Sequence, residues 1–337
     1  MSFIRAFLAL LALIQSALLA FIPLLVRRGT AVVERARRED DVLPCLPIPA
    51  GVWLRPDAYL YSQPALMALG IAVTWDNPDV RILDGAGNTV GSHDLLPSTT
   101  YRIQATIHNR STDAPAPGMP VIFAPAGFGA GAPTIAALAT TIDLPVRAAP
   151  GEPALAEVTW TTPSVPGHYC IVITAIWPDD ANPIDNVGQH NTVIRDAAPG
   201  ERLIVTVPVF NPARDRASFV ATVDSYVLPR EPILAGEGAP LVLAEEARRS
   251  ATSDEDPRLA LIVTANARDR FPAPAAWHAM ISPPELDLEP GGGRDLDFEA
   301  TVPVDAENGS EQRFNIVVTD PDGGVLLGGV TVVVRVR

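Results

Sequence analysis

Histidines are the side chains of this sequence best suited to bind a metal ion or to transfer a proton. His168 and His190 flank a stretch that contains three aspartates, but no serine or cysteine stands with them in a recognisable nucleophile motif. The sequence therefore predicts no catalytic or zinc site, and we interpret both residues as ends of solvated loops. The five histidines, of which no pair has the close spacing of a His-Glu-x-x-His zinc motif, are His93, His108, His168, His190 and His278.

The loop between His168 and His190 is a candidate for calcium binding. Calcium prefers oxygen ligands, which this loop supplies as carboxylates and side-chain amides, although their spacing is not that of a standard calcium loop. The sequence predicts no bound cofactor, and calcium is the alternative. The candidate calcium ligands are Asp179, Asp180, Asn182, Asp185 and Asn186.

The chain has two cysteines, Cys45 and Cys170. In an exported protein they would be expected to form a disulfide. The alternative is two buried thiols, which the sequence favours, because "HYCIVITAIW" around Cys170 is a nearly continuous apolar run. Such a run is typical of a central strand that is buried on both faces.

Composition excludes one large class of partner. The 337 residues carry a formal net charge of −14, and all 25 basic residues are arginine. Nucleic-acid binding depends on clustered positive charge, so nucleic acid is not expected as a partner. Arginine without lysine is typical of bacteria with GC-rich genomes.

The N-terminal region predicts a membrane anchor. Residues 6–26 contain no charged side chain, and a transmembrane helix needs about 20 apolar residues. A cleaved signal peptide would have a shorter apolar run and a small-x-small cleavage site, neither of which is evident. We therefore expect residues 1–40 to form an uncleaved anchor helix with a basic flank. The flank, expected to contact anionic lipid headgroups, contains Arg27, Arg28, Arg35, Arg37 and Arg38.

Beyond residue 40 the sequence predicts β-strands. "YRIQATIHN" places Tyr101, Ile103, Ala105 and Ile107 on one face and leaves His108 on the solvent side. "AEVTW", "RDLDFEATV" and the final "VTVVVRV" alternate in the same way, and turn signals such as "DGAGN" and "DPDGG" separate such stretches. Short strands punctuated by 34 prolines and 24 glycines indicate antiparallel β-sandwiches.

Two sandwiches fit the length of the chain. A short Pro/Gly segment, "RDAAPGE" at residues 195–201, separates strong strand patterns and predicts the boundary. We expect a Pro-rich spacer over 41–78, a first sandwich over 79–196 and a second over 201–337. The stretch 228–257 is long for a loop of a compact domain, which makes it either functional or mobile.

Two motifs carry a family resemblance. "PGHYCIVITAIWPDDANPIDNVGQHNTV" and "YRIQATIHNRSTDAPAPGMPVIF" resemble bacterial immunoglobulin-like modules of the cell-adhesion-related domain type, over residues 78–195. Residues 201–337 are more loosely similar to immunoglobulin-like modules appended to bacterial surface enzymes. The resemblance implies two immunoglobulin-like sandwiches, placed outside the cytoplasm and without catalytic activity.

The side of the membrane is a point of conflict. The arginines after the apolar run place the body of the chain in the cytoplasm by the positive-inside rule, whereas the resemblance places it outside. We expect the β-domains on the periplasmic side of a bacterial inner membrane, with the cytoplasmic side as the alternative.

The sequence is most consistent with a non-catalytic, membrane-anchored structural subunit. Its immunoglobulin-like domains would bind and brace the extrinsic face of a larger membrane complex, with membrane proteins and lipid as partners. One alternative is a cell-surface adhesin or glycan-binding module, for which Trp53, Trp75 and Trp177 are the candidate exposed aromatic residues. Another is an accessory domain of an envelope enzyme.

Overall fold

The computed structural model describes residues 55–165, 167–228 and 267–337. The predicted anchor helix, its five arginines, Cys45, Trp53 and most of the long stretch 228–257 lie outside these residues. Within them, no helix has both the length and the apolar character needed to cross a bilayer. Nearly all of the regular secondary structure in the described residues is β-strand, which confirms the all-β prediction.

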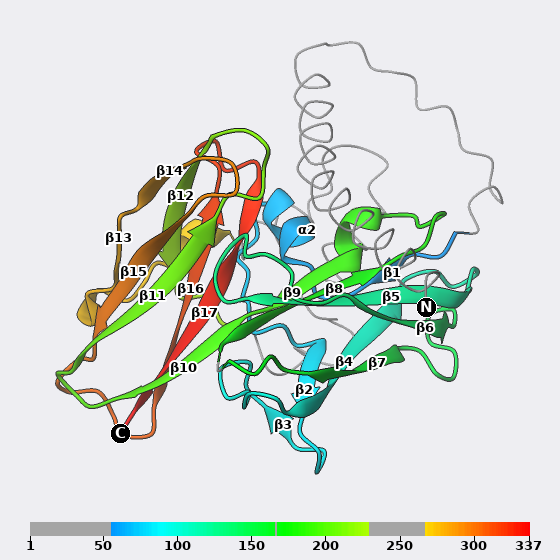
Figure 1. The fold of residues 1–337 in the computed structure, drawn as a ribbon, viewed down its shortest axis with the longest axis horizontal. Coiled ribbons are helices and arrows are strands. Elements are labelled where there is room, and N and C mark those ends of the chain that lie inside the picture. Colours follow the sequence, from blue (N-terminus) through cyan, green and yellow to red (C-terminus); the bar gives the residue numbers. More distant parts are fainter. Residues whose placement is uncertain (1–54, 166, 229–266) are drawn as a thin grey trace.

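The first sandwich packs two antiparallel sheets against each other (Figure 1, cyan and green). Alternation places Ile103 and Ile107 on the inner face of the first sheet, opposite Phe123 and Ile173 of the second, and all four side chains are fully buried. One sheet contains β1 (Ala58–Tyr59), β4 (Thr100–Asn109), β2 (Val80–Leu83) and β3 (Thr89–Val90), with β7 (Ala154–Thr161) on the other side of β4. The other has the order β6 (Leu138–Leu144), β5 (Ala116–Gly127), β8 (Tyr169–Ala175), β9 (Val187–His190).

The second sandwich lies beside the first (Figure 1, with β10, β11 and β12 in green to yellow-green and the later strands in orange and red). Its core includes Phe298 and Phe314, whose ring centroids are 5.1 Å apart, and Val332 and Val334 of the last strand. One sheet has the order β10 (Thr192–Ala197), β17 (Leu326–Val336), β16 (Glu311–Thr319), β12 (Ala217–Asp224), β14 (Glu285–Leu288). The other has the order β11 (Arg202–Phe210), β15 (Gly293–Thr301), β13 (Met280–Ser282).

Strand β10 crosses from one sandwich to the other. The sequence placed residues 192–196 at the end of the first sandwich, but β10 pairs in parallel with β17, from Thr192 opposite Thr331 to Ala197 opposite Val336. The chain leaves the sheet β6–β5–β8–β9 at His190, the end of β9, and enters the second sandwich at Thr192, with Asn191 between the two strands. Asn191 holds this crossing, because its Nδ2 donates to the carbonyl oxygens of Gly129 (3.1 Å) and Gly329 (2.8 Å).

Residues 55–78, predicted to belong to a spacer, are built into the folded body. β1 pairs with β4, and α2 (Gln63–Ala68) follows it, capped by Ser62, whose Oγ accepts from the amide of Ala65 at 3.3 Å. Trp75 is fully buried.

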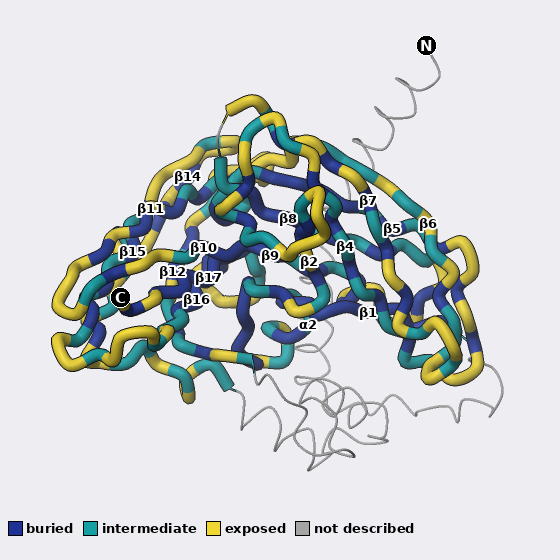
Figure 2. Tube along the Cα trace, turned by 90° about the horizontal axis from the view of Figure 1, so that it is seen from below, coloured by how far each residue is buried: buried dark blue, intermediate teal, exposed yellow. Residues whose placement is uncertain are grey.

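Figure 2 shows buried residues along the facing strands of both sandwiches. The short 3₁₀ helices are η1 (Pro183–Asn186), η2 (Arg268–Arg270) and η3 (Ala275–Trp277).

Candidate functional site

The acidic loop before β9 folds onto β1. Its Asp180 and Asp185 lie with Asp57, all three buried, and one carboxylate oxygen from each falls within 4.8 Å of the others. The Asp180 carboxylate accepts from the amides of Ala58 (2.9 Å) and Asn182 (2.8 Å). The sequence missed Asp57, because it is far from this loop in the chain.

The other candidate calcium ligands play different parts. Asn182 donates from its Nδ2 to Asp185 Oδ2 at 2.7 Å, and the Asn186 side chain, also buried, bonds to Asp180. Asp179 instead forms an exposed ion pair with Arg55 at 3.1 Å. Four of the five candidates therefore gather at one place, and Asp179 lies outside it.

A guanidinium group already supplies positive charge to this cluster. Arg110 Nη1 lies 2.5 Å from Asp185 Oδ2 and 3.6 Å from Asp57 Oδ1, and its guanidinium stacks 3.7 Å from the ring centroid of Tyr59. Burial raises the pKa of Asp180. A calcium ion would have to take the place of the guanidinium. The geometry therefore favours a structural ion-pair network that ties the loop to β1 and β4.

His168 and His190 are not members of this network, whereas His108 adjoins it through Tyr59. His168 Nε2 is 3.3 Å from Ser92 Oγ, and its ring stacks on Phe128 at 4.1 Å between centroids. Burial, and then the positive charges of His93 and Arg195, lower the pKa of His168 to about 3. Burial also lowers the pKa of His190. These imidazoles are therefore neutral at physiological pH. His108 stacks on Tyr59, with centroids 4.9 Å apart, and is half-buried instead of pointing freely to solvent.

Neither Ser92 nor Cys170 is arranged as a nucleophile. The Ser92 hydroxyl donates to the carbonyl of Thr192 at 3.0 Å, which uses its only proton. Cys170 is buried, as the sequence predicted, and burial raises its pKa to about 12. Its sulfur accepts from Gln189 Nε2 at 2.8 Å. Because the Ser92 proton points to Thr192, the neighbouring His168 Nε2 faces the Ser92 oxygen and not its proton.

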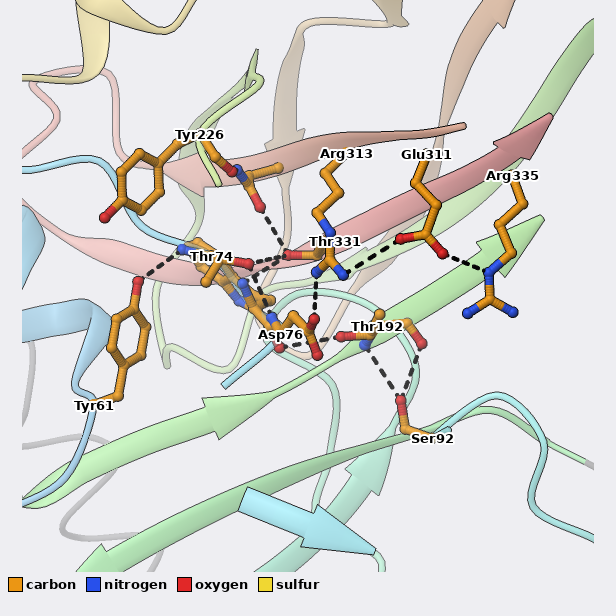
Figure 3. Close-up of polar contacts among 12 residues, drawn as sticks. Tyr61, Thr74, Asp76, Ser92, Thr192, Tyr226, Glu311, Arg313, Thr331 and Arg335 are labelled. Atoms are coloured by element: carbon orange, nitrogen blue, oxygen red, sulfur yellow. Dashed lines mark hydrogen bonds and ion pairs between the residues drawn. The ribbon is translucent and has the colours of Figure 1, made fainter. Parts of the chain in front are cut away.

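A buried chain of hydrogen bonds joins the two sandwiches (Figure 3). Thr331 Oγ1 on β17 donates to Asn315 Oδ1 (2.8 Å) and accepts from the amide of Trp75 (2.7 Å). Its remaining lone pair faces Thr74 Oγ1 at 3.0 Å, so the Thr74 hydroxyl is the donor of that bond. We call Thr74, Trp75, Asn315 and Thr331 the junction network, and every bonding position of the Thr331 hydroxyl is used in it.

Contacts around the junction network strengthen the same joint. Arg313 of β16 forms an ion pair with Asp76 (Figure 3), and the amide of Thr74 donates to the Tyr61 hydroxyl at 3.0 Å. The Trp75 indole packs against Gly329, where a Cβ would lie 2.6 Å from the ring. An added Cβ would also lie 2.2 Å from the carbonyl oxygen of Ile316, so any larger residue at position 329 would force both the indole and β16 to shift.

A second joint forms where the loop after β5 meets the edge of β11. The amide of Ala130 donates to the carbonyl of Pro208 (3.0 Å), and that of Phe210 donates to the carbonyl of Ala130 (2.9 Å). Gly129 permits this approach, since a Cβ there would lie 2.0 Å from the Pro208 oxygen. Two separate joints fix the angle between the sandwiches.

An open groove of about 480 Å³ lies between the sandwiches. Its floor is the outer face of sheet β6–β5–β8–β9, and one wall is built from the β11–β12 loop and the β16–β17 hairpin of the second sandwich. The floor is apolar and rich in small side chains, with a few polar groups such as Thr174 and Gln189. Floor residues include Ile122, Ala124, Ala126, Cys170, Val172 and Val187.

Of the three candidate tryptophans, the two that the structure describes do not provide the exposed aromatic surface that the adhesin alternative needs. Trp75 is fully buried in the junction, and Trp177 packs, partly buried, against the core of the first sandwich. The burial of Trp75 could not be predicted from the sequence around it, because it results from contacts with residues of the second sandwich that are distant in the chain. Trp53 lies outside the described residues.

The fold and site define a two-sandwich, all-β protein. The chain matches no protein-family model and no curated protein. Among solved structures it is similar to WR4, a C. elegans MSP family member, at 10% identity and a TM-score of 0.21, covering 43% of this chain and 92% of that one. It is also similar to the PapD-like domain 7 of human CEP192, at 8% identity and a TM-score of 0.24, covering 44% and 81%.

A longer alignment reaches Escherichia coli alpha-2-macroglobulin, at 10% identity and a TM-score of 0.24. It covers 85% of this chain but 22% of that one. These likenesses are weak, and the general immunoglobulin-like sandwich rests on the strand pairing described above. The comparisons do not single out the cell-adhesion-related type.

Proposed function

We propose that the protein is a non-catalytic structural subunit that holds a partner membrane protein. In this proposal residues 6–26 anchor the chain in a bacterial inner membrane, the arginines that follow contact lipid headgroups, and the sandwiches act on the periplasmic side. The first sandwich is of the cell-adhesion-related type.

One observation carries the proposal: the two sandwiches are locked together by buried polar contacts. The Thr331 hydroxyl joins β17 to Thr74 and Trp75 through bonds of 2.7–3.0 Å, and Thr331 is fully buried. Unsatisfied buried polar groups are costly, so this network specifies one arrangement of the two domains. A fixed angle over two domains is what a brace requires, whereas a flexible adhesive stalk does not need it.

The chemistry of the described residues supports the same function. Arg110 stabilises the buried carboxylate of Asp185, and burial lowers the pKa values of His168 and His190, which keeps both imidazoles neutral. The apolar groove is a concave surface open to a partner. An apolar groove suits protein contact better than acid–base or nucleophilic chemistry.

Purification of the tagged full-length chain in mild detergent tests the proposal. We expect a membrane protein to co-purify in a fixed stoichiometry that survives size-exclusion chromatography. A chain lacking residues 1–40 serves as the control for anchoring and should leave the membrane fraction. Recovery of the full-length protein alone, after crosslinking in intact cells, would overturn the subunit function.

The side of the membrane has its own test. We expect external protease to digest the β-domains in intact spheroplasts, as it does in lysed ones. Protection until lysis would place the domains in the cytoplasm and would overturn the periplasmic part of the proposal.

A further inference from the structure

The groove between the sandwiches has a floor that is suited to receive large apolar side chains. Ala124, Ala126 and Ala139 line it together with Val172 and Val187, so the floor offers apolar surface but little volume of its own. The space of about 480 Å³ lies within the range of roughly 300–1,000 Å³ that is typical of ligand sites. Because the floor side chains are small, a partner that fills the groove must contribute large side chains.

Charge is confined to the wall that the second sandwich provides. Asp215 and Asp320 line the groove, and Asp322 lies in the same exposed turn as Asp320. Arg216 also lines it, but its guanidinium is shared between Asp287 (3.6 Å) and Glu289 (3.8 Å). Among the residues that line the groove, this wall carries two carboxylates, Asp215 and Asp320, against the one guanidinium of Arg216. Asp322 and Arg214 are exposed neighbours of these residues in the sequence.

The charge decides what kind of occupant fits. A second copy of the chain would bring another net charge of −14 towards an acidic wall, which like-charge repulsion disfavours. An acidic or phosphorylated segment meets the same obstacle. A segment with positive charge beside an apolar core complements both surfaces of the groove.

We propose that the groove binds a partner polypeptide segment with a core of bulky apolar side chains flanked by arginine or lysine. The apolar side chains lie on the floor formed by β5, β8 and β9, and the basic residues lie against the β11–β12 loop and the β16–β17 hairpin. This inference rests on the proposed function, because it names the surface by which the brace holds its partner.

Selection from a displayed library of random 12-residue peptides, with the full-length protein in detergent as bait, tests the proposal. We expect the enriched peptides to combine an apolar core with net positive charge. On synthesis, they should bind the Val172→Trp variant at least about tenfold more weakly, because the indole fills the floor. The matched control is Leu155→Trp, which adds the same indole on the opposite sheet, where Leu155 is 55% exposed.

A second pair of variants tests the charge. Asp215→Asn combined with Asp322→Asn should weaken binding about threefold to tenfold and reduce its salt dependence, since rim charges act mainly through screened attraction. The matched control is Asp305→Asn combined with Glu307→Gln, at two acidic positions outside the groove lining. If Val172→Trp does not fold, this pair still decides the outcome.

Several results would overturn the proposal. Peptides that bind Val172→Trp and the wild type equally do not use the groove, and enriched peptides without excess positive charge contradict the role of the acidic wall. A dimer that Val172→Trp abolishes would make a second copy the occupant, and a lipid retained in native mass spectrometry would make it an acyl chain. If peptides bind in the groove but no membrane protein co-purifies with the full-length chain, the structural-subunit function is wrong and the groove proposal still holds.

Discussion

The hydroxyl of Thr331, in the last strand of the second sandwich, lies 3.0 Å from the hydroxyl of Thr74, in the segment that leads into the first. Thr331 is the only polar residue in "VTVVV", residues 330–334, and it is fully buried. Its hydroxyl organises three partners from two separate parts of the chain. The relative placement of the domains therefore depends on a few polar atoms inside apolar surroundings.

Replacement of Thr331 by valine should destabilise the protein. The change keeps the shape but leaves the Trp75 amide, the Thr74 hydroxyl and the Asn315 oxygen without this partner, at a cost of about 1–3 kcal/mol. Urea unfolding, followed by tryptophan fluorescence and by circular dichroism, measures the loss. The control is Thr141→Val on the exposed face of β6, and equal stability of the two variants would contradict the role of the junction network.

Removal of the guanidinium from the buried ion network should cost more. Arg110→Met leaves Asp57 and Asp185 buried without that positive charge, and breaking a buried pair typically costs about 3–5 kcal/mol. The same urea titration gives the change in unfolding free energy. Arg81→Met, at an exposed position of β2, is the control. A similar loss of unfolding free energy in both variants would show that the buried ion network does not contribute more to stability than an exposed arginine does.

Calcium should leave the stability of the full-length chain unchanged. Arg110 lies 2.5 Å from Asp185 and already neutralises charge at the place where a calcium ion would bind. We therefore expect the same melting temperature in millimolar calcium and in chelator. A higher melting temperature with calcium, lost in an Asp180→Asn variant, would establish the loop as a calcium site.

Acid should destabilise the protein through His168. Burial lowers its pKa from the usual 6.5 to about 3, so between these values the unfolded chain binds a proton that the folded chain does not. The free energy of unfolding therefore falls as pH drops from 6.5 towards 3, by up to about 1.4 kcal/mol per pH unit from this group. Above pH 6.5 the histidine is neutral in both states and contributes no slope.

Urea titrations between pH 7 and pH 4 measure this slope. His168→Gln, which keeps a neutral polar group beside Ser92, should flatten the dependence, whereas His278→Asn at an exposed position should not. An unchanged slope in His168→Gln would assign the acid sensitivity to other groups, of which His190 is the next to test.

Local alternation in the sequence predicts strands but not their partners. The inward residues of β4, β7, β15 and β17 follow directly from a period of two. The predicted first sandwich, 79–196, includes most of β10, yet the sequence carries no information that β10 pairs with β17 of the other sandwich. The burial of Trp75 and the approach of Asp57 to Asp185 also depend on contacts between segments distant in the chain.

The groove could not be predicted from the sequence either, because it also depends on contacts between segments that are distant in the chain. Val172 and Thr174 occupy one face of a nearly continuous apolar strand, so the sequence predicted burial on both faces. The second sandwich stands beside this face without filling the space above it, and both residues stay partly exposed. The width of the groove therefore depends on the angle between the two sandwiches, which the two joints determine.

The loop joint depends on Gly129, and its replacement by alanine should open it. The residue has a φ of +114°, and an added Cβ would lie 2.0 Å from the Pro208 oxygen. The loop or β11 must then move, so overpacking and backbone strain together should cost about 3 kcal/mol or more. Gly118→Ala is the matched control, because Gly118 also has positive φ (+65°) but nothing within 4 Å of an added Cβ. Hydrogen exchange should show faster exchange at the amides of Ala130 and Phe210 in Gly129→Ala alone. Retained protection at both amides would mean that the contact is not what holds the loop against β11.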